Sequence, residues 1–136
     1  MSLQKTLSII KPDAYKAGHT NAINSMIENA GLIIVKKKEL QLTKEQAQKF
    51  YSVHSEKPFY DELCDFMISG PIIVQMLEGK DAINLYRKVM GATNPEEAEE
   101  NTIRKKFANS IQENAVHGSD SEENAVKELE FFFNEN

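Results

Sequence analysis

The sequence predicts an α+β fold in which helices pack on a four-stranded antiparallel sheet, with an irregular loop insertion in the second half of the chain. Three observations support this prediction. Apolar runs of strand length alternate with segments that show helical spacing of apolar residues. The 136 residues match the size of one domain. No internal repeat, linker or low-complexity segment divides residues 1–136, so we expect a single domain.

Four runs rich in β-branched and other apolar residues predict the strands. These runs begin or end next to residues that interrupt regular structure, such as Pro12 after the first run and Pro71 before the third. The second run is β-branched at first and alternates at its end, which is typical of a long strand with a solvated tail. In chain order, the predicted strands cover residues 5–11, 32–42, 72–79 and 115–117.

Five segments are predicted to be helical because apolar residues recur on one side or because capping residues mark their ends. Gly31 and Gly91 each follow a helical segment and are natural stops. In chain order, the predicted helices cover residues 21–30, 44–51, 58–68, 82–90 and 122–133. Four residues at or next to their starts are favoured there: Thr43, Pro58, Asp81 and Ser121.

The order of these elements predicts the topology. Without the helix pair at 44–68, the elements follow a split βαββαβ plan, the plan of ferredoxin-like folds. Residues 91–114 are predicted to be largely irregular and form the insertion.

Charge and composition narrow the function and the compartment. The net charge of −5 gives no overall attraction for nucleic acid, so an anion site needs a local cluster of cations. One cysteine, Cys64, permits no intramolecular disulfide, which fits a reducing compartment. No apolar run reaches the roughly 20 residues of a membrane span. The N-terminal "MSLQKTLSIIKPD" lacks the features of a signal peptide, and we expect a cytoplasmic protein.

Common phosphate and metal motifs are missing from the sequence. The glycines form neither a P-loop nor a G-x-G-x-x-G pattern, and the three histidines are not spaced as metal ligands. A phosphate site would therefore need scattered side chains. Each candidate alone is typical of a solvated position: Lys11, Arg87, Thr93, Arg104 and Asn114.

His117 differs from these candidates because of its neighbours in "HGSDS". A neutral imidazole, with an unperturbed pKa of about 6.5, is a good nucleophile towards phosphorus if it is held in one orientation. Glu128 on the following helix could orient the ring directly or through Ser119. Gly118 could let the backbone approach a ligand. The alternative is that this segment is only a strand that leads into a capped helix.

Several blocks, in order and spanning nearly the whole chain, carry a resemblance to a known family. "NAVHGSDS" follows "TLSIIKPDA", "KPFYDEL", "MISGPIIVQMLEG", "GATNPEEA" and "TIRKKFA". Together they resemble nucleoside diphosphate kinases. The resemblance implies that a nucleoside triphosphate donates its γ-phosphoryl group to His117, and that a nucleoside diphosphate then accepts it in the same pocket by a ping-pong mechanism.

The resemblance also implies a role for each matching residue. The implied nucleotide contacts are Lys11 with the transferring phosphoryl and the 3′-hydroxyl, Asn114 with the sugar hydroxyls, Phe59 and Ile111 with the base, and Arg87, Thr93 and Arg104 with the distal phosphates. The implied supporting residues are Tyr51 beside Lys11 and His117, Ser119 and Glu128 as orienting groups, and Asp120 near Mg²⁺ through water.

Substrate range follows from these implied contacts. Stacking on one aromatic face tolerates every base. We therefore expect broad use of nucleoside triphosphates and diphosphates, including ATP, GTP and deoxy forms, with Mg²⁺ as the cofactor.

The irregular segment departs from the common family pattern. Glu100 and Asn101 stand where many members have Pro-Gly, Lys105 and Lys106 where many have an acidic residue, and Glu113 replaces a basic residue of some relatives. We expect these changes to affect loop rigidity and assembly rather than chemistry. The resemblance implies a homo-oligomer, and we expect a tetramer rather than a hexamer, with no membrane or specific nucleic-acid partner.

Two other functions compete with phosphotransfer. One is a non-catalytic, nucleotide-binding regulatory domain of ferredoxin-like fold, and the other is a DNA-binding interaction protein. A complete set of His117, Lys11, Arg104, Asn114 and Glu128 favours the enzyme, because a binding module needs no oriented nucleophile.

Overall fold

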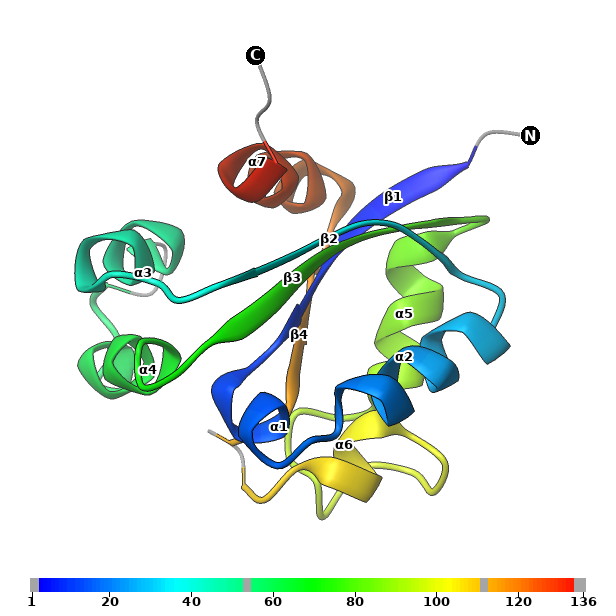
Figure 1. The fold of residues 1–136 in the computed structure, drawn as a ribbon, viewed down its shortest axis with the longest axis horizontal. Coiled ribbons are helices and arrows are strands. Elements are labelled where there is room, and N and C mark those ends of the chain that lie inside the picture. The colour runs from blue at the N-terminus through cyan, green and yellow to red at the C-terminus, as the bar shows by residue number, and fades with distance from the viewer. Residues whose placement is uncertain (1–2, 53–54, 111–112, 134–136) are drawn as a thin grey trace.

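The computed structural model describes residues 3–52, 55–110 and 113–133 (Figure 1). The strands are β1 (Gln4–Ile10), β2 (Ile33–Leu40), β3 (Ile72–Gly79) and β4 (Val116–Gly118). The helices are α1 (Pro12–Lys16), α2 (Thr20–Asn29), α3 (Lys44–Phe50), α4 (Tyr60–Met67), α5 (Ala82–Met90), α6 (Ile103–Phe107) and α7 (Glu122–Phe133). The sheet order is β2-β3-β1-β4 and every neighbouring pair is antiparallel, which confirms the predicted fold class.

Two short helices were not predicted. α1 starts at Pro12, where the sequence pattern predicts only the end of a strand, although proline also suits the first position of a helix. α6 lies inside the segment predicted to be irregular, and the Thr102 side chain caps it by accepting from the Lys105 amide at 3.3 Å. Five residues are too few to show a helical period, so pattern reasoning missed both.

Several predicted boundaries differ by one or two residues from the observed ones, including both ends of β2, and two of these differences have a local structural reason. α4 begins at Tyr60 rather than at Pro58, because the Tyr60 amide donates to the Lys57 carbonyl in a turn that precedes the helix. β4 is shifted by one residue from the predicted 115–117, because Ala115 has a φ of 72° and cannot continue an extended strand.

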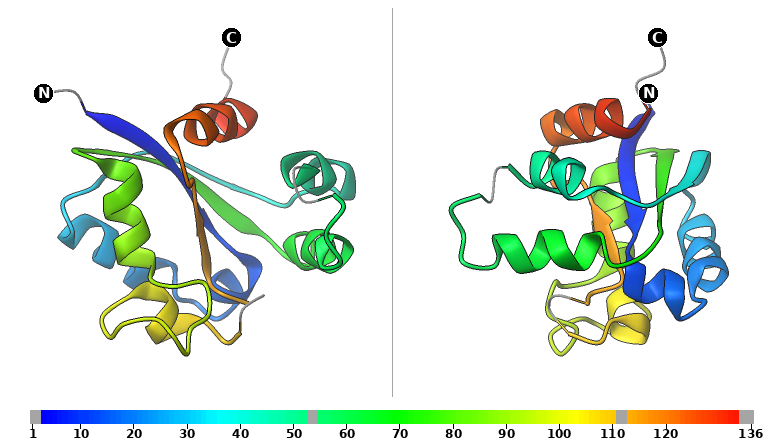
Figure 2. Two further views of the ribbon diagram at one scale, coloured as in Figure 1. Left: turned by 180° about the vertical axis from the view of Figure 1, so that it is seen from behind. Right: turned by 60° about the vertical axis from the view of Figure 1, so that its left-hand side comes forward.

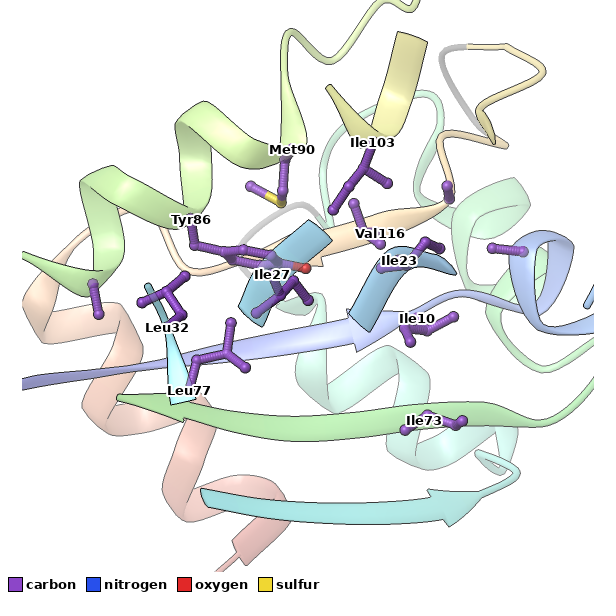
Figure 3. Close-up of a cluster of buried hydrophobic side chains, with 13 residues drawn as sticks. Ile10, Ile23, Ile27, Leu32, Ile73, Leu77, Tyr86, Met90, Ile103 and Val116 are labelled. Carbon is purple, nitrogen blue, oxygen red and sulfur yellow. The ribbon is translucent and has the colours of Figure 1, made fainter. Parts of the chain in front are cut away.

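The sheet has a hydrophobic cluster on each face, with α2 and α5 on one face and α3, α4 and α7 on the other (Figure 2). Alternate strand residues face opposite clusters. Ile10 and Val116 belong to the cluster that includes Tyr86 of α5 (Figure 3), whereas Ile9 belongs to the cluster on the α7 side. Because His117 follows Val116 in β4 and pairs with Ile9, its side chain lies on the face that α7 covers.

Gly118 is required by helix packing. A Cβ at this position would lie 2.7 Å from Met90 Cε and 2.8 Å from Tyr86 Cδ2. The space where its side chain would lie is filled by α5. The expected approach of a ligand to the Gly118 backbone stays a prediction.

Gly118→Ala is therefore expected to destabilise the fold by about 1–3 kcal/mol, because α5 must move away from the sheet. Chemical denaturation would measure the loss. Gly70→Ala is a matched control, since the nearest atom to its added Cβ is 3.8 Å away. Equal stability of the two variants would contradict the packing argument.

The segment between α5 and α6 keeps a backbone conformation that glycine favours. Asn101, at one of the positions that depart from the family pattern, has a φ of 70°. Asparagine tolerates this left-handed region better than most residues, so the substitution is compatible with the turn. Within the described ranges, no helix has both the length and the apolar character that crossing a membrane requires.

Candidate active site

His117 is held by a carboxylate on α7. Its Nε2 lies 3.0 Å from Glu128 Oε1, and about a fifth of each side chain is exposed. An ionised carboxylate can only accept, so Nε2 carries the hydrogen and Nδ1 carries the lone pair. The interaction therefore favours one tautomer, in which the lone pair of Nδ1 is free.

Ser119 ties the same carboxylate to the sheet. Its Oγ donates to Glu128 Oε1 at 2.8 Å and accepts from the Leu7 amide at 3.4 Å. The sequence left open whether Glu128 contacts the ring directly or acts through Ser119, and both contacts occur. β1, β4 and α7 together fix the ring.

Two aromatic residues at the end of α3 lie edge-on to the imidazole. The ring centroid of His117 is 5.5 Å from that of Phe50 and 6.5 Å from that of Tyr51. Burial raises the pKa of the Tyr51 hydroxyl, and this group has no hydrogen-bond partner among the described residues. The implied support of His117 by Tyr51 is therefore an aromatic contact, and in the described part of the chain no hydrogen bond joins Tyr51 to Lys11. Sequence reasoning missed Phe50, whose only signal was its place beside Tyr51.

Lys11 and Asn114 form a second cluster. Lys11 Nζ donates to Asn114 Oδ1 at 2.8 Å, and both side chains are buried. Burial and, to a smaller extent, the charge of Arg104 lower the pKa of Lys11 from 10.5 to about 8, and Asp13 opposes the change. An anion brought close to this amine would be strongly attracted, because little water screens it.

Arg104 is buried against backbone carbonyls. Nε donates to Asn114 O at 3.3 Å, Nη1 to Gly91 O at 3.1 Å and Nη2 to Val116 O at 2.9 Å. Guanidinium has five N–H groups, so two remain to bind a phosphate. Desolvation lowers the pKa of Arg104, and its carbonyl partners fix its position between the insertion and β4.

The residues implied for the distal phosphates line one cavity of about 680 Å³. Arg87, Thr93 and Arg104 contribute to it, together with Gly118 of β4. Gly118 directly follows His117, so the cavity lies beside the histidine strand. A second cavity of equal volume, between β2, α3 and the end of α7, contains none of the predicted site residues.

The other predicted residues are more peripheral. Phe59 precedes α4 and is 46% exposed, which leaves much of its side chain accessible. Asp120 is exposed and accepts from Asn124 Nδ2 at 2.6 Å, a bond that lowers the pKa of its carboxyl group. Among the described residues, no cluster of three or more His, Cys, Asp or Glu side chains could hold a metal ion. Ile111 lies outside the described residues.

Comparisons with known proteins agree on one family. The family model described as "Nucleoside diphosphate kinase" matches residues 4–136. The chain is 61% identical over 135 residues to a nucleoside diphosphate kinase of Hyphomonas neptunium, covering 99% of this chain and 96% of that protein. It is 62% identical over 133 residues to one of Rhodovulum sulfidophilum, covering 98% and 95%.

Solved structures give the same result. The Aquifex aeolicus nucleoside diphosphate kinase superposes with a TM-score of 0.95 at 41% identity, covering 97% of this chain and 96% of that one. The enzyme of Encephalitozoon cuniculi, solved in its apo form, gives 0.94 at 36% identity, covering 97% and 90%.

Proposed function

Because this chain belongs to the nucleoside diphosphate kinase family, we propose that it transfers a γ-phosphoryl group between nucleotides through Nδ1 of His117. It is a phosphotransferase, which argues against the non-catalytic alternative. The observation that carries the proposal is the hydrogen bond of His117 Nε2 to Glu128, which leaves Nδ1 with the lone pair.

The proposed reaction has two steps that share one pocket. Nδ1 attacks the γ-phosphorus, an N–P bond forms, and the bond from this phosphorus to the bridging oxygen breaks, so a nucleoside diphosphate leaves. The imidazole becomes cationic and Glu128 stabilises that charge. A second nucleoside diphosphate then attacks the phosphorus with a terminal oxygen, and neutral His117 is restored.

Transfer depends chiefly on positioning and on stabilising the phosphate charge. Lys11 and Arg104 supply buried cationic groups in a protein whose net charge is −5. Arg87 and Thr93 line the adjoining cavity and would bind the distal phosphates.

Kinases that act on nucleotides generally need a divalent cation, and we propose Mg²⁺. The residues present fit an ion that is held mainly by the nucleotide phosphates. The described ranges contain no cluster of metal-ligating side chains, and Asp120, which follows β4, is exposed. Asp120 would contact the ion through water. When bound, Mg²⁺ neutralises the phosphate charge that develops during transfer.

Base and sugar recognition support broad specificity. An exposed Phe59 offers a stacking face that any base can use, with Ile111 proposed for the opposite face. Asn114 Oδ1 is occupied by Lys11, so its amide nitrogen would serve the sugar hydroxyls.

Incubation with γ-labelled ATP tests the proposed function. The protein is expected to take up label that is acid-labile and alkali-stable, and the label should move to any added nucleoside diphosphate, purine or pyrimidine. Label that is absent, or that does not move to an acceptor, would reject the ping-pong mechanism.

Lys11 is expected to take up a proton when nucleotide binds at pH 8 to 9. Its pKa of about 8 in the free protein should rise beside a phosphate, since an anion stabilises the charged amine. Calorimetry in buffers of different ionisation enthalpy would measure the uptake. Lys11→Gln should remove it, whereas Lys127→Gln, on the exposed side of α7, should not.

The lowered pKa of Lys11 should also affect the stability of the protein in the absence of nucleotide. Between pH 8 and 10.5 unfolded Lys11 keeps its proton while folded Lys11 loses it, so this group makes the free energy of unfolding rise with pH over that range.

The oligomeric state and the cellular location of the protein are also part of the proposed function. Edge strand β2 exposes Ile33 and Val35, which supports association of subunits, and we propose a tetramer. Cys64 is a buried free thiol, which supports a cytoplasmic location.

A further inference from the structure

Ala115 adopts an unusual backbone conformation beside the histidine strand. Its φ is 72°, in the left-handed region that residues with a side chain rarely occupy. The Val116 amide donates to the Asn114 carbonyl at 2.8 Å and closes a tight turn around Ala115. Such a conformation persists only where surrounding contacts hold it.

The segment from Lys11 to Asp13 holds both backbone groups of Ala115. The Lys11 amide donates to Ala115 O at 2.9 Å, and the Ala115 amide donates to Asp13 Oδ2 at 3.1 Å. The Asp13 bond joins residues 102 positions apart in the sequence, so α1 holds a turn that lies far from it along the chain.

The turn lies at the centre of the cationic cluster. The Asn114 carbonyl also accepts from Arg104 Nε, and Asn114 Oδ1 accepts from Lys11 Nζ. If Ala115 relaxed to negative φ, the Asn114–Ala115 peptide would rotate. The carbonyl and side chain of Asn114 would then lose their alignment with Arg104 and Lys11.

We propose that Asp13 is a positioning residue for phosphoryl transfer: its carboxylate holds the Ala115 turn and so keeps Lys11, Asn114 and Arg104 aligned with His117. This inference rests on the function proposed above and gives a role to a residue that sequence reasoning left unassigned. Its only signal was its place after Lys11 and Pro12.

The role needs an acceptor more than a charge. Burial raises the pKa of the Asp13 carboxyl group, and its Oδ1 is buried without a hydrogen-bond partner among the described residues. Asparagine offers a carbonyl oxygen of the same reach, so it should preserve the turn, whereas alanine should not.

The test compares variants in single-turnover phosphorylation of His117 by γ-labelled ATP, with the apparent affinity for ATP and the melting temperature measured separately. Asp13→Ala is expected to slow phosphorylation about 10- to 100-fold with less than about 3-fold change in affinity, because small displacements of positioned groups are costly to transfer rates. Asp13→Asn should stay within about 3-fold of the wild-type rate.

A second substitution separates this role from a general structural one. Glycine adopts positive φ without strain, so Ala115→Gly in the Asp13→Ala background should restore at least about 5-fold of the lost rate. Glu39→Ala is the matched control, because it removes a different side-chain bond of α1, the 2.6 Å bond from Tyr15, without touching the turn.

Three results would overturn the inference alone while the wild type is labelled. They are an Asp13→Ala rate within 2-fold of wild type, a loss that Ala115→Gly leaves unchanged, and an equal loss in Glu39→Ala. If Asp13→Ala does not fold, Asp13→Ser, whose hydroxyl is too short to reach the amide, carries the same comparison. A wild type that takes no label would overturn the proposed function and this inference with it.

Discussion

Replacing His117 with alanine is expected to abolish the phosphorylated intermediate and to lower kcat/KM by at least about 10⁴-fold. The reason is that Nδ1 is the atom proposed to accept the phosphoryl group, so this substitution removes the nucleophile itself. Glu128 would keep its bond from Ser119, so the support of the site should survive the substitution. Acid-labile label and steady-state transfer would measure the effect.

The His117→Ala variant is expected to bind nucleotide still. Nucleotide affinity, measured by calorimetry, should change by less than about 10-fold, because the cationic cluster does not depend on the ring. His19→Gln is a matched control, since His19 stacks on Phe107 at 4.5 Å and lies outside the proposed site. Full labelling of His117→Ala would reject His117 as the nucleophile.

Arg104→Ala is expected to damage both activity and stability. It removes a cation that is proposed to stabilise the transferring phosphate, so kcat/KM should fall by about 10²-fold or more. It also removes the hydrogen bonds that Arg104 donates to the carbonyl oxygens of Gly91, Asn114 and Val116. This loss should lower the free energy of unfolding by about 3 kcal/mol. Kinetics and chemical denaturation would measure the two losses.

Two further variants separate these effects. Arg104→Lys keeps the charge, but one ammonium cannot reproduce the planar arrangement of donors, so stability should recover only in part. Arg87→Ala removes an exposed arginine from the same cavity and should weaken donor binding without lowering stability. An Arg104→Ala variant with wild-type kinetics and stability would remove this residue from the site.

Local patterns were sufficient for most of the regular structure. The run at 72–79 is β3 residue for residue, and Thr43 caps α3 with its hydroxyl and with the reciprocal Gln46 bond. Ser121 accepts from the Asn124 amide at the start of α7, as its capping role requires. These features were predictable because they depend on residues within a few positions of one another. The short helices α1 and α6 were not, since neither is long enough to show a period.

The site likewise combines residues that the sequence indicated with contacts that only the structure shows. The family resemblance indicated His117, Glu128, Ser119, Lys11, Asn114 and Arg104, and the structure brings these side chains into two contacting sets. No sequence pattern predicted the carbonyl partners of Arg104, the edge contact of Phe50 or the bond from Ala115 to Asp13. Each of them depends on how distant segments approach one another.

By itself, the sequence determined the fold class and the family of the chain and indicated His117 as the candidate nucleophile, because apolar periodicity and local motifs encode these properties. Only the tertiary structure decided which imidazole nitrogen is free, why position 118 must be glycine and how Ala115 is held. These depend on contacts among β1, β4, α1, α5 and α7, whose geometry is set by packing over long sequence separations.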